Sequence, residues 1–191
     1  MKNPWQTLST RQIYENAWFR VREDQVIRPD GNPGIYGVIE FADSVGVVAL
    51  NANGEIALVG QWRYTRNRNT WELPIGSSKQ SDGGMLGAAQ RELREETGLA
   101  AERWDRIGVL DCIVGATTER ATLFLARDLK QGDAQPDPEE AIVVRWVPLA
   151  EAVAMVMRDE ITECISVAAI LRAEKLASQS VADTAGAESG Q

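Results

Sequence analysis

The residues from Arg91 to Leu99 constrain this chain more than any other part, and they read Arg-Glu-Leu-Arg-Glu-Glu-Thr-Gly-Leu. The run contains three carboxylates, Glu92, Glu95 and Glu96. In a helix this spacing places all three on one face within a single turn. Because like charges so close repel one another, the cluster indicates a cation above it. Oxygen ligands without histidine favour Mg²⁺ or Mn²⁺ over zinc, whereas a solvated acidic face is the alternative for such a triplet.

Other residues support a packed helix in this segment. Three apolar residues recur at helical spacing, which we expect to pack on a different face from the glutamates: Leu86, Ala89 and Leu93. Arg91 precedes Glu95 by four residues and can pair with it. Gly98 is expected to end the helix. Upstream, residues 71–76 predict a short strand and a turn, and a loop then leads to a helix start near residues 82–84. A strand, a loop and an acidic helix in this order suit a metal–phosphate site.

In these segments the chain resembles the Nudix hydrolase family. Residues 91–99 match the second half of the Nudix box at every position, and Gly76 fits the glycine that opens it. The first half departs from the pattern, because the loop is one residue longer than usual. The glutamate expected six positions after the glycine is replaced by Asp82, or by Gly83 when counted back from Arg91. The resemblance implies these metal ligands: Glu92, Glu96, the carbonyl of Ile75 or Gly76, and Glu95 as a ligand or a ligand's partner.

Four phrases look like the branch that hydrolyses ADP-ribose and other nucleoside diphosphate sugars; they lie at residues 14–21, 61–64, 71–74 and 115–119. One position departs from ADP-ribose-selective members, in which a proline often precedes the glycine that corresponds to Gly115; here it is Val114. The resemblance implies a nucleoside diphosphate sugar as substrate, with ADP-ribose and GDP-mannose both open. It also implies these substrate contacts: Arg63, Glu72, Arg91, Gly115 and Glu119.

The expected reaction is attack of water on one phosphorus of the pyrophosphate, assisted by Mg²⁺ or Mn²⁺. In the branch that the chain resembles, the base that takes the proton of this water is often a glutamate on a loop. Glu139 and Glu140 lie in such a segment, and Glu119 is the alternative. In some members the box glutamates act as the base themselves.

The order of predicted elements indicates an α/β fold, a mixed sheet between helices in an α/β/α sandwich, with a small N-terminal antiparallel hairpin. We expect a β extension over residues 1–42, a Nudix domain over 43–177 and a disordered tail over 178–191. The hairpin comprises strands at 18–28 and 35–41, and it is a candidate contact in a homodimer because it cannot bury both faces alone. The remaining elements are expected as strands at 45–50, 55–62, 105–113, 120–127 and 141–147, and as helices at 148–158 and 162–177.

Composition excludes several classes of protein. The chain has no histidine, which excludes nucleophilic sites that need an imidazole base. Its net charge of −8 argues against binding nucleic acid. No apolar run approaches the roughly 18 residues that span a bilayer. With no signal-peptide core and two separated cysteines, Cys112 and Cys164, we expect a cytoplasmic protein without disulfides.

Two alternatives remain open from the sequence. The first is a pyrophosphohydrolase that acts on nucleoside triphosphates or dinucleotides. The second is a non-catalytic Nudix-fold module that binds a nucleotide sugar, although a pure binder has no need of the glutamate trio.

Overall fold

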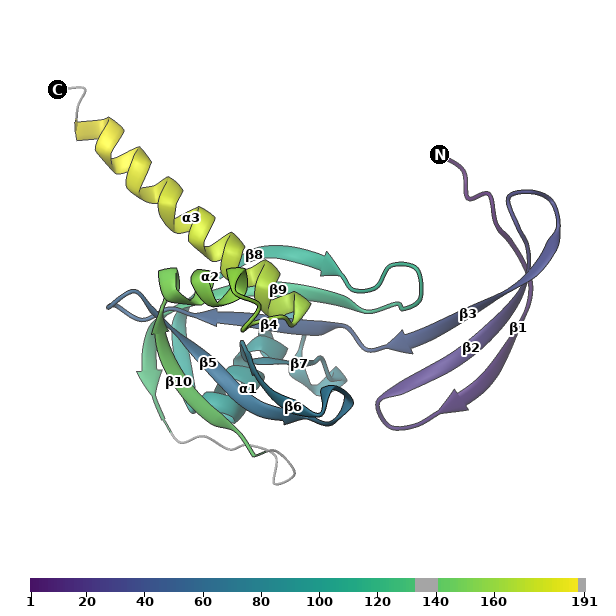
Figure 1. The fold of residues 1–191 in the computed structure, drawn as a ribbon, viewed down its shortest axis with the longest axis horizontal. Helices are drawn as coiled ribbons and strands as arrows, with labels where there is room; N and C mark the ends of the chain where they lie inside the picture. Colours follow the sequence, from purple (N-terminus) through teal and green to yellow (C-terminus); the bar gives the residue numbers. More distant parts are fainter. Residues whose placement is uncertain (133–140, 189–191) are drawn as a thin grey trace. The chain divides into compact units, whose positions relative to one another are not determined.

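The computed structural model describes residues 1–132 and 141–188, with side chains as far as residue 179. Two compact units make up the chain (Figure 1). The first unit contains residues 1–43 and 111–120, and the second contains residues 44–110 together with the chain from residue 121 onward.

The first unit is a three-stranded antiparallel sheet in the order β1-β2-β3. Its strands are β1 (Gln6–Glu15), β2 (Phe19–Ile27) and β3 (Pro33–Phe41). The β2–β3 hairpin confirms the sequence prediction, and Gly31, with a φ of 81°, lies in its turn. Strand β1 was not predicted. Every residue of β1 is exposed, so its sequence lacks the apolar alternation that marks a half-buried strand.

The second unit contains a mixed sheet in the order β7-β4-β9-β8. Strand β4 (Ser44–Ala49) is fully buried and runs parallel to β9 (Arg120–Gln131) and antiparallel to β7 (Ile75–Ser77). The two edge strands are β7 and β8 (Leu99–Asp111). We expected one sheet in this domain, but three strands form a separate antiparallel sheet in the order β10-β5-β6. They are β10 (Val143–Pro148), β5 (Glu55–Arg63) and β6 (Arg68–Glu72).

In the described part of this unit there are three α-helices: α1 (Met85–Thr97), α2 (Leu149–Met157) and α3 (Cys164–Glu188). Helices α1 and α3 both pack on β4, and Figure 1 shows them on opposite sides of that strand. The predicted α/β/α sandwich is therefore confirmed. Helix α3 continues past residue 177, where we expected it to end, and the disorder of residues 178–191 stays a prediction. No helix in the described part of the chain is long and apolar enough to cross a membrane.

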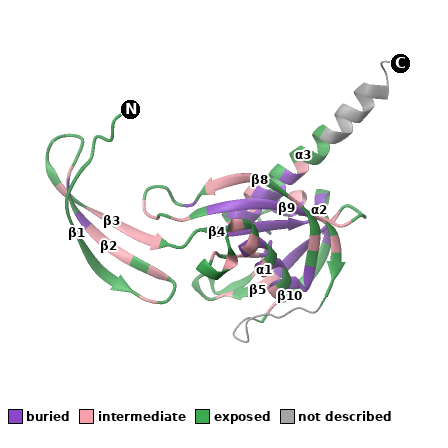
Figure 2. Cartoon of the chain, turned by 180° about the vertical axis from the view of Figure 1, so that it is seen from behind, coloured by how far each residue is buried: buried purple, intermediate pink, exposed green. Residues whose placement is uncertain are grey.

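Burial concentrates in the second unit, around β4, β9 and α1 (Figure 2). Ala89 and Leu93 are fully buried there, as the helical spacing predicts. The same prediction is wrong for Leu86, which is 43% exposed because it lies in the first turn of α1, before the buried arc begins at Ala88. It is also wrong in leaving the glutamate face free. Glu92 and Glu96 are only 9% and 6% exposed, because the spacing that groups them with one another also places them within the arc that faces the protein.

Candidate active site

Helix α1 begins and ends at glycines. Gly83 and Gly84 precede it with φ values of 72° and 122°, a region that L side chains rarely adopt. Gly98 follows it with a φ of 72° and donates its backbone N–H to the carbonyl of Arg94 at 2.9 Å, which confirms the predicted end. These glycines set the length of the acidic helix and let the chain turn at both of its ends.

Arg91 connects the carboxylates of α1 to the loop before it. Its Nη1 donates to Glu92 Oε1 at 2.7 Å and to Glu95 Oε2 at 2.9 Å, so the expected pairing with Glu95 is present. Its Nε and Nη2 donate to the two carboxylate oxygens of Asp82 at 2.8 and 3.1 Å. Nη2 also reaches the carbonyl oxygen of Ser77 at 2.8 Å. One guanidinium therefore balances three carboxylates and ties the end of β7 to α1.

Asp82 is a site residue whose role sequence reasoning did not assign. Its hydrogen bonds with Arg91, and then with the backbone N–H of Lys79, lower its pKa to about 2. The side chain is 4% exposed. The one signal in the sequence was the aspartate in place of the expected box glutamate, in a loop one residue longer. An aspartate side chain is one methylene shorter than the glutamate of the box pattern. The additional residue lengthens the loop, and we infer that this allows Asp82 to contact Arg91.

Glu92 lies against Gly76. A Cβ atom added to Gly76 would overlap the Glu92 carboxylate, so only glycine leaves room for this carboxylate beside β7. Burial raises the pKa of Glu92, although Arg91 opposes this effect. A carboxylate whose charge is disfavoured by burial gains most from a cation, and this fits the donor chemistry of a hard divalent ion.

The carboxylates are not already assembled around one ion position. Across residues 1–132 and 141–179, whose side chains the structure describes, no three His, Cys, Asp or Glu side chains are grouped as ligands of a single metal. Arg91 accounts for this, because it occupies an oxygen of Glu92 and one of Glu95. The residue types and their common helix face fit Mg²⁺ or Mn²⁺.

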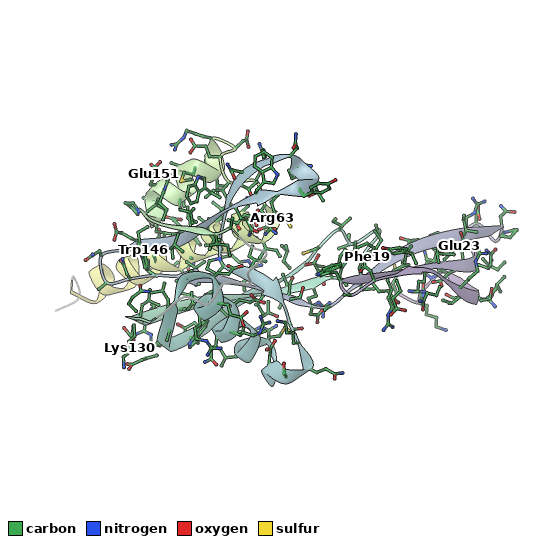
Figure 3. All side chains as sticks on the ribbon, turned by 90° about the horizontal axis from the view of Figure 1, so that it is seen from below. Phe19, Glu23, Arg63, Lys130, Trp146 and Glu151 are labelled. Carbon is green, nitrogen blue, oxygen red and sulfur yellow. The ribbon has the colours of Figure 1, made fainter. Side chains whose placement is uncertain are left out.

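A second arginine, Arg63, lies at the end of β5 and is labelled in Figure 3. Its Nε and Nη2 donate to the two carboxylate oxygens of Glu72 at 3.0 and 2.5 Å. The hydroxyl of Thr70 donates to Oε1 of the same carboxylate at 2.7 Å. Glu72 is 1% exposed, and burial would raise its pKa, but the bonds from Arg63 and Thr70 outweigh burial and leave the pKa lowered.

Comparisons with known proteins agree with this geometry. Residues 40–165 match the family model of the NUDIX domain, and residues 5–39 match that of the nucleoside diphosphate sugar hydrolase N-terminal domain. This chain belongs to the Nudix family. It is a pyrophosphohydrolase by class, as the resemblance implied.

Two relatives share most of this Nudix chain. An ADP-ribose pyrophosphatase of Mycobacterium tuberculosis (strain ATCC 25618 / H37Rv) is 36% identical over 172 residues, which cover 89% of this chain and 83% of the relative. An ADP-ribose pyrophosphatase of Bacillus subtilis (strain 168) is 26% identical over 166 residues, covering 86% and 89%. A crystal structure of an ADP compounds hydrolase superposes with a TM-score of 0.83 at 17% identity, covering 92% of this chain and 95% of that one, which supports the fold.

The expected Nudix site residues are distributed over both units of the chain. Ile75 and Gly76 lie in β7, paired with β4, next to the helix that carries the box glutamates. Gly115 and Glu119 belong to the first unit instead. There the Gly115 carbonyl accepts from the Tyr36 hydroxyl at 2.9 Å. Glu139 and Glu140, the candidate bases, lie outside the described residues.

Glu72 lies in a closed environment. We expected it to contact substrate, and this stays a prediction; the residue is buried, and both of its oxygens accept hydrogen bonds from protein side chains. Of the Arg63–Glu72 pair, Arg63 keeps exposed surface, since its side chain is 38% exposed.

Proposed function

We propose that this enzyme hydrolyses the pyrophosphate bond of a nucleoside diphosphate sugar, with ADP-ribose as the first substrate to test and a hexose conjugate such as GDP-mannose as the second. The products are a nucleoside monophosphate and a sugar phosphate. The arrangement of two box carboxylates, Glu92 and Glu95, and of Asp82 around Arg91, beside Gly76, is the single observation that carries the proposal. The N-terminal family match and the names of the two relatives support the substrate class.

Nudix ADP-ribose pyrophosphatases are metal-dependent hydrolases, and we propose Mg²⁺ or Mn²⁺ as the ion here. When bound, the ion supplies charge compensation for the phosphates and lowers the pKa of the attacking water. Glu92 and Glu96 would hold it, with Glu95 and the carbonyl of Ile75 or Gly76 beside them. Arg91 orients Glu92 and Glu95 and ties them to the loop through the Ser77 carbonyl and Asp82.

Two further protein groups complete the proposed chemistry. Arg63 offers its exposed edge to a phosphate or to the terminal sugar. Glu139 or Glu140 takes the proton of the water, with Glu119 as the alternative, and single substitutions to glutamine identify which one. Loss of activity that recovers at higher pH in one variant points to that residue as the base.

The enzyme is proposed to act as a cytoplasmic homodimer, in which the first unit contributes the contact. Several large apolar residues of this unit are exposed: Trp5, Leu8, Ile13, Tyr14, Trp18, Ile35 and Phe41. A sheet of three strands leaves such residues in water unless a second surface covers them. Sedimentation at micromolar concentration distinguishes a dimer from a monomer, and a monomer would contradict this part of the proposal.

The deciding experiment is product analysis with Mg²⁺ on ADP-ribose, GDP-mannose, UDP-glucose, diadenosine polyphosphates and dNTPs. Glu96→Gln is assayed beside the wild type, and Glu55→Gln serves as a matched control, because Glu55 lies at the start of β5 and bonds to Asn51. Cleavage of a diphosphate sugar that is lost only in Glu96→Gln supports the proposal. Preferential cleavage of a triphosphate or dinucleotide supports the first alternative, and tight binding without cleavage supports a binding module.

A further inference from the structure

Arg63 and Glu72 form an ion pair whose cost calls for an explanation. Glu72 is 1% exposed, and taking a carboxylate out of water to pair with arginine is weak evidence of stabilisation, because desolvation offsets the attraction. An apolar pair of similar volume would often stabilise such a position equally well. The pair therefore fits a different role, in which the buried carboxylate fixes how the guanidinium is presented.

The register of the β5–β6 hairpin shows how this is done. Glu72 lies opposite Val59, four residues before Arg63 on the neighbouring strand, and Thr70 lies opposite Gln61. The Arg63 side chain thus lies back along the sheet toward Glu72 instead of extending beyond the strand. Thr70, between them in the hairpin, donates to Glu72 Oε1, the same oxygen that accepts from Arg63 Nε, and so helps to hold the carboxylate in place.

The ion pair with Glu72 uses one edge of the Arg63 guanidinium, and the other edge makes no contact with Glu72. Two of the five N–H groups of Arg63, on Nε and Nη2, are used by Glu72. Nη1 makes no hydrogen bond with any side chain or carbonyl of the described residues, and the side chain keeps 38% of its surface in solvent. The pKa of Arg63 is raised mainly by its hydrogen bond to Glu72 and further by the charges of Glu72, Glu96 and Glu163. Helix α1, which carries Glu96, also contacts β5, the strand of Arg63.

We propose that Glu72 and Thr70 are positioning residues that hold the free Nη1 edge of Arg63 toward the phosphates of the substrate. Glu72 itself does not contact the substrate. This inference rests on the proposed function, because it takes the ligand of Arg63 to be a pyrophosphate group. A fixed fork loses less conformational entropy on binding than a mobile one, so the pair acts through affinity for the diphosphate.

The test combines steady-state kinetics on ADP-ribose with the binding of magnesium pyrophosphate, measured by calorimetry. Glu72→Gln keeps the volume and one acceptor but removes the charge and the matched pair of oxygens. We expect the KM to rise about tenfold and kcat to change less, with a similar loss in pyrophosphate affinity. Thr70→Val should shift the same quantities by roughly two- to threefold, because the ion pair remains. Glu55→Gln, at the other end of β5, is the control and should change neither quantity.

A double-mutant cycle separates positioning from a merely structural role. Arg63→Lys keeps the charge but cannot present the same fork, so Glu72→Gln should add little to the KM of Arg63→Lys if Glu72 acts through Arg63. Additive effects on KM, or a Glu72→Gln variant that unfolds at lower temperature with unchanged KM, would overturn the inference. If the wild type does not cleave ADP-ribose, the proposed function fails. The inference is then decided by pyrophosphate binding to the same variants, and equal affinity across them would overturn it.

Discussion

Arg91 and Arg63 both bind carboxylates in the second unit, and they do so in opposite ways. Arg91 uses all three of its nitrogens on protein groups, is 13% exposed, and shares its charge among three carboxylates. Arg63 uses one edge on a single carboxylate and keeps the other edge accessible. The comparison suggests that Arg91 compensates charge within the box, whereas Arg63 is held ready for a ligand.

The largest expected effect is on activity, when a box carboxylate loses its charge. Glu92→Gln should reduce kcat by roughly 10²–10³-fold, because a proposed ligand of the divalent ion is lost. Burial raises the pKa of Glu92, so its ionised form is disfavoured in the folded protein, and glutamine removes that cost. The metal-free variant should therefore unfold at the same or a higher temperature than the wild type. A variant that is both inactive and clearly less stable would contradict this separation of function from stability.

A second prediction uses magnesium to tell the two arginines apart. Arg91→Ala leaves three carboxylates without their partner, and Arg63→Ala leaves Glu72 buried and unpaired. Each should lower the free energy of unfolding by about 3 kcal/mol. Magnesium should restore part of the loss in Arg91→Ala, because it replaces the missing charge, and none of it in Arg63→Ala. Urea unfolding with and without Mg²⁺ measures the loss of stability in each variant and how much of it Mg²⁺ restores. If Mg²⁺ restores the same amount in both variants, the different roles proposed for the two arginines are contradicted.

Sequence reasoning found the box and the helix but not the environment of its glutamates. The spacing of Glu92, Glu95 and Glu96 and the position of Gly98 fix a helix with one acidic face, and these are local features. That Glu92 is buried against Gly76 depends on where β7 lies, which is a long-range feature. The pairing of Arg63 with Glu72 likewise depends on strand register, and a resemblance alone assigned both to the substrate. Strand β1 was not predicted because all of its residues are exposed, so its sequence has no alternation of apolar and polar residues.

A third prediction compares conservative changes of the two arginines. Lysine keeps the charge but has no planar fork. Arg63→Lys should raise the KM for the substrate about tenfold and leave the response to Mg²⁺ concentration as in the wild type. Arg91→Lys should instead change the Mg²⁺ concentration at half-maximal rate, because the orientation of Glu92 and Glu95 depends on Arg91. Rates measured against substrate concentration and against Mg²⁺ concentration check this prediction for each variant. A raised KM in Arg91→Lys together with a changed Mg²⁺ response in Arg63→Lys would reverse the roles that we assign.

The smallest expected effect concerns the acid stability that Asp82 contributes through Arg91. The pKa of Asp82 is about 2 in the folded protein, against an ordinary value of 3.8. A carboxyl whose pKa is lowered on folding contributes stability that is complete above its unfolded pKa and is lost as the pH falls toward its folded pKa. Asp82→Asn should therefore be less stable than the wild type at neutral pH, and the difference should shrink between about pH 4 and pH 2. Asp105→Asn is the matched control. Asp105 pairs with Arg127, but the Asp105 side chain is 49% exposed, so its substitution should change the unfolding temperature little at any pH. A constant difference between Asp82→Asn and the wild type across that window would mean that Asp82 acts through its shape and hydrogen bonds, and that the charge balance assigned to Arg91 does not extend to the loop.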